Sequence, residues 1–593
     1  MCRIAGLVTN RLRGDEVKRV VNVMCHTLQH GGPDDAGLYC NADTRVVFGH
    51  RRLSIIDLSA NGHQPMADAE LKAWITFNGE LYNYRELKTE LQQLGAAFHT
   101  GTDTEVIIQA YLHWGTSSFD KLRGMFAFAL YDTITEAVYL VRDTTGIKPL
   151  YYYAEDGQLS FASEIRAFKA AGIATAEDTR WPVWLLAFGH IPEPYTTLKN
   201  VLSVPKGYFL CWNKNGAYTI TSYNRATAGN YITDIQTAQA GISQHLKTAI
   251  SRQLIADAPI GVFLSGGIDS SLLALLANEE RKQLKTISIL FNEKEYDERK
   301  YQNAVLDKLS GENFTHLVKQ QDFEEHFPQI LRAMDMPTTD GINTWFISKY
   351  AHEDGLKTVL SGVGADELFG GYPSFSRIKY MGYLKMLPPA LFSASKIFSA
   401  SRYKKLAYLA HNNSIANYLF LRGLYAPADI ALLIDMDTTE VNNILFNTIT
   451  TPDLGAHNKS QAAWLETNLY MQNQLLHDTD IMSMSHGLEV RVPFLDEDLQ
   501  QYVSQIDPAI RFDNHQPKKI LIDTFKELLP ETVWNRPKMG FSFPLQQWMV
   551  NNSAISDEEL YRGKSAKGLI NKFNKGQIHW SRAFALYQIQ GHV

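Results

Sequence analysis

The segment GVFLSGGIDSSLLALLA, residues 261–277, constrains the fold of this 593-residue chain more than any other. An apolar run of strand character meets a pair of glycines and continues directly as a helix with apolar periodicity. A buried strand followed at once by a helix is the repeating unit of a parallel, doubly wound sheet. Two more apolar runs, KTISILF and LKTVLSG, each precede a helix-compatible segment. The sequence therefore predicts an α/β domain over residues 233–593, with added helices between about 374 and 475.

The glycine-rich turn in this segment has the composition of a phosphate-binding loop. Its glycines let the backbone approach phosphate oxygens, and the helix that follows offers free N–H groups. A Walker-type loop would have lysine before the serine, whereas Asp269 precedes Ser270 here. An acid beside phosphates implies a metal ion, so Asp269 predicts Mg²⁺. The alternative is a glycine-rich turn that binds no ligand.

A second loop, TVLSGVGADELFGGYP, repeats this design, with a strand that runs into Ser361 and Gly362. It adds Asp366 as another carboxylate for the metal, although the segment alone could be a plain turn. Nearer the C-terminus, NRPKMGFSFP places Arg536 and Lys538 in a Pro/Gly-rich stretch, where a cation can reach a phosphate chain. The alternative for Lys538 is a solvated surface lysine.

The first half of the chain consists of short strand-like runs separated by turns. Runs such as TRVVFGHRRLSIIDLS, KAWITFNGELYNY and MFAFALYD alternate β-branched and aromatic residues, interrupted by Gly, Asn and Asp. Two stretches with helical character, DEVKRVVNVMCHTLQH and YRELKTELQQLG, accompany them. These patterns predict helices packed on antiparallel sheets over residues 2–212. We expect residues 213–232 to form a last strand and a connector.

The chain begins MCRIAG, which places a thiol at the second residue. If Met1 is removed, Cys2 carries both a nucleophile and a free α-amine. An amine with a pKa of about 7.7–8.0 is partly neutral near pH 7 and can take the thiol proton. Such a residue is an activated nucleophile by itself. The alternative is an ordinary small residue near a terminus.

Charge and cysteine content exclude several classes of protein. The chain has 57 basic and 63 acidic residues and a formal charge of −6, with no basic run that would track nucleic acid. Its four cysteines have no paired CxxC spacing, so we expect neither a zinc site nor a disulfide framework. The sequence has no signal-peptide pattern and no run of about 18 apolar residues, so no membrane association is expected. The expected setting is a reducing cytoplasm.

Together these motifs resemble those of the glutamine-dependent asparagine synthetase family, over nearly the whole chain. The first half resembles a class II glutamine amidotransferase domain, which implies an α+β N-terminal-nucleophile hydrolase sandwich (αββα). The second half resembles an ATP pyrophosphatase-type synthetase domain, whose phosphate loop is SGGxDS. The resemblance implies ATP and Mg²⁺ as cofactors, small-molecule substrates and, as is common in the family, a homodimer.

The resemblance also assigns roles in glutamine hydrolysis. Cys2 would be the nucleophile after removal of Met1, and Asn78 and Gly79 would form the oxyanion hole. The residues that would bind glutamine are Arg52 at its α-carboxylate, Glu80 and Asp103 at its α-amine, and also Ile55 and Asn78. Taken singly, the Asn-Gly pair would be a hairpin turn and Asp103 a solvated loop acid.

In the second half, the resemblance assigns an ATP site. The residues that would bind ATP are Leu264, Ser265, Gly267, Asp269, Ser270, Ser361 and Gly362. Asp269 and Asp366 would bind the metal, and Lys538 would neutralise charge as pyrophosphate leaves. Glu489 and Arg491 would either shape the synthetase pocket, together with Asp480, or form a structural ion pair.

Five further positions bear on ammonia transfer and on the acceptor. Met125 matches a wall position of the family's internal ammonia tunnel and is equally a core filler. Four positions depart from the family pattern: Arg3 replaces Gly, Gly31 replaces the Arg of RGPD, Ile481 replaces a frequent Arg, and Val363 replaces Glu. Valine cannot ionise or hydrogen-bond, so either another acid serves the acceptor or ammonia step, or the acceptor is not aspartate.

The implied reaction is ATP-dependent amidation of a carboxylate through an acyl-adenylate, with ammonia from glutamine hydrolysis. The leading interpretation is a glutamine-hydrolysing asparagine synthase, which converts aspartate, glutamine, ATP and water to asparagine, glutamate, AMP and diphosphate. One alternative is the same chemistry on a non-aspartate carboxylate, such as a cell-envelope sugar or a natural-product acid. Another is a catalytically inactive homologue that binds glutamine or ATP.

Overall fold

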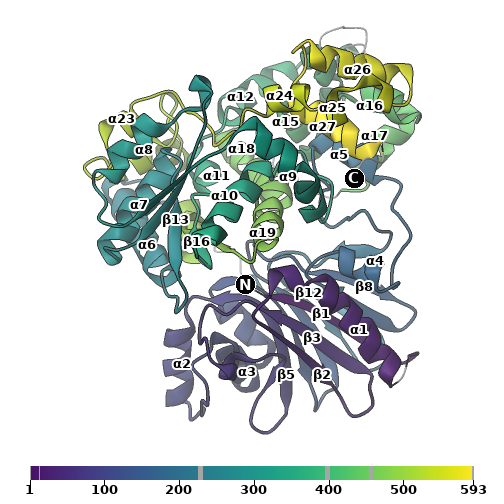
Figure 1. Ribbon diagram of the computed structural model, residues 1–593, viewed down its shortest axis with the longest axis vertical. Helices are drawn as coiled ribbons and strands as arrows, with labels where there is room; N and C mark the ends of the chain where they lie inside the picture. Colours follow the sequence, from purple (N-terminus) through teal and green to yellow (C-terminus); the bar gives the residue numbers. More distant parts are fainter. Residues whose placement is uncertain are drawn as a thin grey trace.

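The computed structural model describes residues 2–12, 14–224, 231–393, 401–449, 451–452 and 458–590. Met1, part of the expected connector at 213–232 and parts of the expected helical region at 374–475 lie outside the described residues. Figure 1 shows the N-terminal half as a layered body at the bottom of the view, with the C-terminal half above it. The N-terminus lies at the junction between the two, which places Cys2 there.

The N-terminal half contains two antiparallel sheets of six strands each. The first has the order β10 (Val201–Ser203), β8 (Tyr151–Glu155), β9 (Gln158–Ala162), β1 (Arg3–Thr9), β3 (Val46–Arg52) and β2 (Asp35–Cys40). The second has the order β12 (Tyr218–Ser222), β11 (Tyr208–Trp212), β7 (Ala137–Arg142), β6 (Gly124–Asp132), β5 (Ala73–Leu81) and β4 (Met66–Ala67). Four helices accompany these sheets: α1 (Asp15–Thr27), α2 (Tyr84–Gln93), α3 (Asp103–Trp114) and α4 (Arg166–Ala170). Helix α5 (Trp181–Phe188) instead packs with helices of the C-terminal half, at the top of Figure 1.

Alternation along the strands places one apolar face of each sheet against the other and the opposite face under helices. Ile4 and Phe161 of the first sheet share a buried cluster with Leu140 of the second. Helix α1 covers the outer face of the first sheet, while α2 and α3 cover the outer face of the second. The predicted αββα sandwich is confirmed.

The C-terminal half is built around a parallel sheet of five strands. Its order is β15 (Asn313–Leu317), β14 (Lys285–Leu290), β13 (Ile260–Phe263), β16 (Thr358–Leu360) and β17 (Glu489–Arg491). The neighbouring residues Val359 and Leu360 of β16 belong to different buried clusters, so helices cover both faces of the sheet. The predicted doubly wound α/β fold is therefore confirmed.

Helices surround this sheet and extend beyond it, toward the upper right of Figure 1. They are α6 (Ile235–Gln253), α7 (Ile268–Glu280), α8 (Arg299–Leu306), α9 (Gln320–Ala333), α10 (Ile342–Glu353), α11 (Ala365–Phe369), α12 (Ser374–Leu384), α13 (Pro389–Ser393), α14 (Ser401–Lys404), α15 (Ser414–Arg422), α16 (Pro427–Ile434), α17 (Thr438–Asn447), α18 (Lys459–Leu465), α19 (His477–Met484), α20 (Glu497–Ser504), α21 (Pro508–Arg511), α22 (Lys519–Thr524), α23 (Glu531–Trp534), α24 (Leu545–Asn551), α25 (Ser553–Ser556), α26 (Lys564–Asn574) and α27 (Trp580–Ile589). A π-helix, Glu466–Leu476, joins α18 to α19. Within the described ranges, none of the helices is long and apolar enough to span a bilayer.

The two halves share a core and a buried ionic contact. Ile55 and Met125 of the first half belong to the same apolar cluster as Met471 and Met482 of the second. Asp480, on α19, receives hydrogen bonds or ion pairs from two cations of the first half, Lys148 at 2.6 Å and Arg3 at 2.9 Å. The strand that follows Cys2 is thus held directly against the C-terminal half.

Candidate active sites

Cys2 immediately precedes β1, at the junction of the halves. Its side chain is buried, and the thiol donates a long hydrogen bond, 4.0 Å, to the carbonyl oxygen of Leu53. Burial raises the pKa of the thiol to about 11. The thiol therefore stays protonated near neutral pH and needs a base in contact with it to become a nucleophile. The predicted α-amine of Cys2 would be such a base.

Arg52, at the end of β3, has a fixed position near this thiol. Its guanidinium donates hydrogen bonds to the carbonyl oxygens of Ser59 at 2.9 Å and of Asp57. A Cβ on Gly62 would lie 1.8 Å from the Arg52 Nη2 atom, so only glycine leaves room for it. The positive charge of Arg52 lowers the pKa of the Cys2 thiol, because the two groups are close enough to interact electrostatically.

Asn78 and Gly79 lie together on β5. The side chain of Asn78 is fully buried, and neither its Nδ2 nor its Oδ1 atom has a hydrogen-bond partner among the described residues. A buried amide without partners costs free energy, and both of its polar atoms are available to hydrogen-bond a ligand. A Cβ on Gly79 would lie 2.1 Å from the carbonyl oxygen of Met125, so glycine is required at this position.

Two buried carboxyls, Glu80 on β5 and Asp103 at the start of α3, lie close enough to interact electrostatically. Burial raises the pKa of Glu80 well above its usual value, and the negative charge of Glu489 adds to this effect. Burial also raises the pKa of Asp103 to about 6, although the Leu81 N–H donates a 2.9 Å hydrogen bond to Oδ2. A bound cation would favour the charged form of both groups.

Arg491 connects this first site to the C-terminal half. Its Nε atom lies 2.6 Å from Glu489 Oε1. The two residues therefore form an ion pair, which is the structural alternative to a role in shaping the synthetase pocket. Its Nη2 atom lies 3.6 Å from Glu80 Oε1. Ile55 makes a second connection, because its carbonyl oxygen accepts a 3.0 Å hydrogen bond from the Asp257 N–H.

The second site lies where β13 and β16 end. These strands are parallel neighbours, with Val262 opposite Leu360, so the loops that follow them meet at one edge of the sheet. In the first loop, the hydroxyl groups of Ser265 and Ser270 are hydrogen-bonded at 3.0 Å. Gly266, between β13 and α7, has a φ of +78°, which favours glycine.

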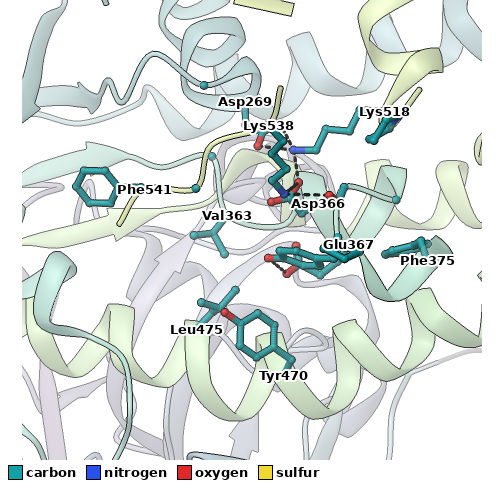
Figure 2. Close-up of a pocket in the computed structure, with 18 of the residues that line it drawn as sticks. Asp269, Val363, Asp366, Glu367, Phe375, Tyr470, Leu475, Lys518, Lys538 and Phe541 are labelled. Carbon is teal, nitrogen blue, oxygen red and sulfur yellow. Dashed lines mark hydrogen bonds and ion pairs between the residues drawn. The ribbon is translucent and has the colours of Figure 1, made fainter. Parts of the chain in front are cut away.

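Two lysines and two carboxylates meet at this edge of the sheet (Figure 2). Lys518 Nζ donates hydrogen bonds to both carboxylate oxygens of Asp269, at 2.6 and 2.7 Å, and also contacts Asp366. Lys538 Nζ lies 2.6 Å from Asp366 Oδ1. Asp269, Asp366 and Lys538 are three residues predicted from the sequence, whereas Lys518 was not predicted. The adjacent lysines in QPKK, in the same C-terminal segment as Lys538, were a signal for it.

Asp269 and Asp366 are a suitable donor set for Mg²⁺, which is held in proteins by one or two carboxylates together with phosphate oxygens. A Cβ on Gly371 would lie 1.7 Å from Asp366 Oδ1, and one on Gly362 would lie 2.8 Å from Asp269 Cβ. Glycine is therefore needed at both positions to leave space beside the carboxylates. Across the part of the chain that the structure describes, no group of three or more His, Cys, Asp or Glu residues could hold a metal alone. The two carboxylates thus fit a magnesium ion, and phosphate oxygens would complete its coordination.

A cavity of about 1550 Å³ extends from these loops toward α19 and the π-helix. Its walls include the predicted catalytic residue Lys538 and all but one of the residues predicted for ATP and the metal: Ser265, Gly267, Asp269, Ser270, Ser361, Gly362 and Asp366. Leu264 is fully buried at the end of β13 and is not one of the lining residues. Val363 lines the cavity, whereas Ile481 is buried in α19 and does not.

Comparisons with known proteins agree with this arrangement. The family description "Asparagine synthase" matches residues 241–572, and "Glutamine amidotransferase domain" matches residues 1–224. The chain is 31% identical to asparagine synthetase [glutamine-hydrolyzing] 1 of Bacillus subtilis, over 93% of this chain and 88% of the relative. It is 31% identical to a putative asparagine synthetase of Mycobacterium tuberculosis, over 88% and 84% of the two chains. It is also 27% identical to an amidase of Gibberella zeae, over 92% and 90%.

Proposed function

The chain belongs to the asparagine synthase family of glutamine-dependent, ATP-using ligases, and we propose that its acceptor is L-aspartate, which it converts to L-asparagine. The observation that carries the ATP-dependent step is the meeting of Asp269, Asp366, Lys518 and Lys538 at the ends of β13 and β16. Two carboxylates for a metal and two cations for phosphates are what transfer of AMP to a carboxylate requires. Aspartate as the acceptor is supported by the similarity to asparagine synthetases.

We further propose a division of labour along the chain. Residues 2–212 form the glutaminase domain, and residues 233–593 form the synthetase domain. The first supplies ammonia at the junction, where Cys2 lies, and the second uses it in the cavity. The shared apolar cluster that contains Met125 lies between them and is the candidate route for ammonia. Four free cysteines are consistent with a cytoplasmic setting.

In the glutaminase step, the Cys2 sulfur attacks the side-chain amide carbon of glutamine while the α-amine of the processed residue takes the thiol proton. Asn78 Nδ2 and the Gly79 N–H stabilise the negative charge on the amide oxygen. The C–N bond then breaks, the proton passes to the leaving nitrogen, and ammonia departs from a thioester that water hydrolyses to glutamate. Arg52 would orient the α-carboxylate, and Glu80 and Asp103 the α-amine.

In the synthetase step, a carboxylate oxygen of the acceptor attacks the α-phosphorus of ATP and the bond to the β-phosphate breaks, which releases diphosphate. The N–H groups of the loop that contains Ser265 and Gly267 bind phosphate oxygens, and Lys538 neutralises the leaving group. Asp269 and Asp366 would hold Mg²⁺, which supplies charge neutralisation when it is bound. Ammonia then displaces AMP from the acyl carbon to give the amide.

Val363 favours a second candidate, amidation of a carboxylate other than aspartate. It places an apolar side chain on the cavity wall near Leu475 and Phe541 (Figure 2). The amidase of Gibberella zeae, at 27% identity, carries a different name within the same set of relatives. A larger or less polar acceptor would fit this wall.

The experiment that distinguishes the two is a product assay. Purified protein receives ATP, Mg²⁺ and glutamine, with aspartate or with a panel of other carboxylic acids, and products are followed by mass spectrometry. We expect diphosphate, AMP and asparagine in equal amounts that depend on aspartate. Diphosphate formed only with another acid would support the second candidate.

A further inference from the structure

Arg422, the last residue of α15, is a cation of the cavity that the assigned roles leave unused. Its Nε atom lies 2.6 Å from Glu466 Oε2, and Glu466 is buried on the π-helix. A guanidinium carries five N–H donors, and this ion pair is made through the Nε atom. Neither Nη atom of Arg422 has a hydrogen-bond partner among the described residues. Because Arg422 lines the cavity, these donors are available to a ligand there.

Two tyrosine rings hold this guanidinium in place. The Arg422 Cζ atom lies 3.6 Å from the centroid of the Tyr470 ring and 4.6 Å from that of the Tyr372 ring. Tyr372 is itself fixed, because its hydroxyl donates a 2.8 Å hydrogen bond to Glu367 Oε1. Contact with aromatic rings restrains a cation without using its N–H donors. The side chain is therefore preorganised to bind an anion, and the planar fork of a guanidinium matches a carboxylate.

Tyr372 also places Arg422 close to the phosphate end of the cavity. The Lys538 Nζ atom lies 4.5 Å from the centroid of the same Tyr372 ring, and it pairs with Asp366. One aromatic ring thus separates Arg422 from the cation that the proposed mechanism assigns to the leaving diphosphate. Figure 2 shows the π-helix, which carries Tyr470, along the wall below Asp366. An acceptor that presents one carboxylate to ATP can therefore place a second one at Arg422.

Asp340 adds a negative charge to the same part of the cavity. It lies on the loop before α10, lines the cavity and accepts a 2.8 Å hydrogen bond from the Gly341 N–H through Oδ1. Burial raises its pKa to about 6, the negative charge of Asp478 adds to this effect, and the positive charge of Arg422 opposes it. Asp340 and Arg422 are therefore close enough to interact electrostatically, although the two residues form no ion pair. Two opposite charges that line one cavity without pairing leave space for a ligand that carries both.

Resting on the proposed function, we propose that Arg422 and Asp340 bind the head group of an α-amino acid acceptor. The two Nη groups of Arg422 hold its α-carboxylate, and Asp340 holds its α-ammonium group. The side-chain carboxylate of the acceptor then faces ATP at the phosphate end. Because one aromatic ring separates Arg422 from Lys538, the acceptor class is an acidic α-amino acid with a short side chain.

Two other charged residues of the cavity are less suited to these roles. Both oxygens of Asp478 are bonded, one to the Thr338 hydroxyl at 2.7 Å and one to the His477 ring at 3.2 Å. Lys379 is exposed, and its Nζ atom lies 5.1 Å from the centroid of the Tyr380 ring. A solvated cation contributes little to binding a carboxylate. Lys379 is therefore the matched control for Arg422, since it is a cation of the same cavity without the buried position.

The first experiment removes each charge from the acceptor and leaves the protein unchanged. Adenylation by the full chain is measured with Mg²⁺ as acceptor-dependent exchange of diphosphate into ATP. β-Alanine is aspartate without the α-carboxylate, and succinate is aspartate without the α-amine. We expect kcat/KM to be about 10–100-fold lower with either analogue, because each loses one charge-assisted contact. An analogue that is not adenylated is scored by its inhibition constant against aspartate, with the same expected ratio.

The second experiment matches each residue to one group of the acceptor. Arg422→Lys keeps a charge for Glu466 but loses the planar fork, so kcat/KM with aspartate should fall by about tenfold, mostly through KM. The same variant should use β-alanine within about threefold of wild type, because β-alanine has no α-carboxylate to lose. Asp340→Asn should lower kcat/KM with aspartate in the same way and leave succinate unchanged. Lys379→Met should change none of the three, and glutamine hydrolysis, which uses the other site, reports that each variant is folded.

The outcomes distinguish this inference from the proposed function. If wild type shows no exchange with any carboxylate, the proposed function fails. If exchange depends on aspartate but Arg422→Lys and Asp340→Asn lower kcat/KM with aspartate, β-alanine and succinate by the same factor, the two residues do not bind the head group. Equal use of the three acceptors by wild type would also overturn the assignment. So would exchange that requires an acid without an amino-acid head group in place of aspartate.

Discussion

Arg3 lies directly over Gly31, because a Cβ built on Gly31 would come within 2.7 Å of the Arg3 Cγ atom. The guanidinium of Arg3 is fully buried and pairs with Glu164 at 2.6 Å and with Asp480, in the C-terminal half, at 2.9 Å. The two departures from the family pattern, Arg at position 3 and Gly at position 31, are therefore one structural feature. Arginine at position 3 occupies space that a side chain at position 31 would need.

This relationship predicts that the two positions are coupled in stability. Removing one partner of a buried ion pair costs about 3–5 kcal/mol, so Arg3→Gly should lower the thermal midpoint strongly. Gly31→Arg should do the same by collision with Arg3. The double variant Arg3→Gly/Gly31→Arg should be more stable than the sum of the single changes predicts, by about 1 kcal/mol or more. Thermal unfolding of all four proteins measures this, and strict additivity would contradict the coupling.

Cys2→Ala should separate the two activities. It removes the sulfur that attacks glutamine, so glutamate formation should fall to background. Amide formation with ammonium salts should stay within about twofold of wild type, because the cavity is built from other elements. Assays with each nitrogen donor test this directly. A parallel loss of both activities would mean that Cys2 supports the fold rather than the glutaminase.

Lys518→Met should weaken the ATP site. Lys518 lies between Asp269 and Asp366, and its loss removes the cation that bridges the two carboxylates, while Lys538 still pairs with Asp366. We expect diphosphate exchange to fall by about tenfold or more and the Mg²⁺ concentration needed for half-maximal rate to change. Lys519→Met is the matched control, because Lys519 pairs with Asp523 on α22 instead. Equal effects of the two substitutions would show that Lys518 has no special role.

Glu367, a buried carboxyl on α11, should make the stability of the protein depend on pH, and Glu367→Gln should remove this dependence. The pKa of Glu367 is raised from 4.5 to about 7 in the folded protein, so between these values the unfolded chain loses this proton while the native state keeps it. Stability contributed at low pH is therefore lost as pH rises through about 7. Glutamine does not titrate, so the variant should gain up to about 3 kcal/mol over wild type between about pH 5 and pH 8. Unfolding of both proteins at the two pH values measures the difference, and a constant difference would contradict the raised pKa.

The parts of the fold that could be predicted are those that local pattern determines. The residues around Ser265 predict a strand, a glycine-rich turn and a helix in that order, because each of these elements is specified by residues that are adjacent in sequence. The strand alternation of the first half likewise predicts its sheets. Their grouping into two packed sheets came from the resemblance, and the six strands of each sheet came from the structure, since many pairings satisfy the same alternation.

Other features depend on residues that are distant in sequence. The lysine pair of QPKK marks Lys518 as a candidate cation, but its partner Asp269 lies far away in the sequence and is identified only by the fold. The pairing of Arg3 with Asp480 is similar, because it forms only when the halves pack together. The sequence places Glu367 beside Asp366, but its burial and its unpartnered oxygen follow from how Tyr372 and the π-helix enclose α11. Such environments are set by tertiary packing.

The most direct test of the account follows the amide nitrogen. Purified protein is given ATP, Mg²⁺, aspartate and glutamine with an isotopically labelled amide nitrogen, in the presence of unlabelled ammonium ions. We predict asparagine that carries the label, formed in equal amounts with glutamate, AMP and diphosphate. Labelled ammonia released into solution, without aspartate-dependent formation of AMP and diphosphate, would contradict the account.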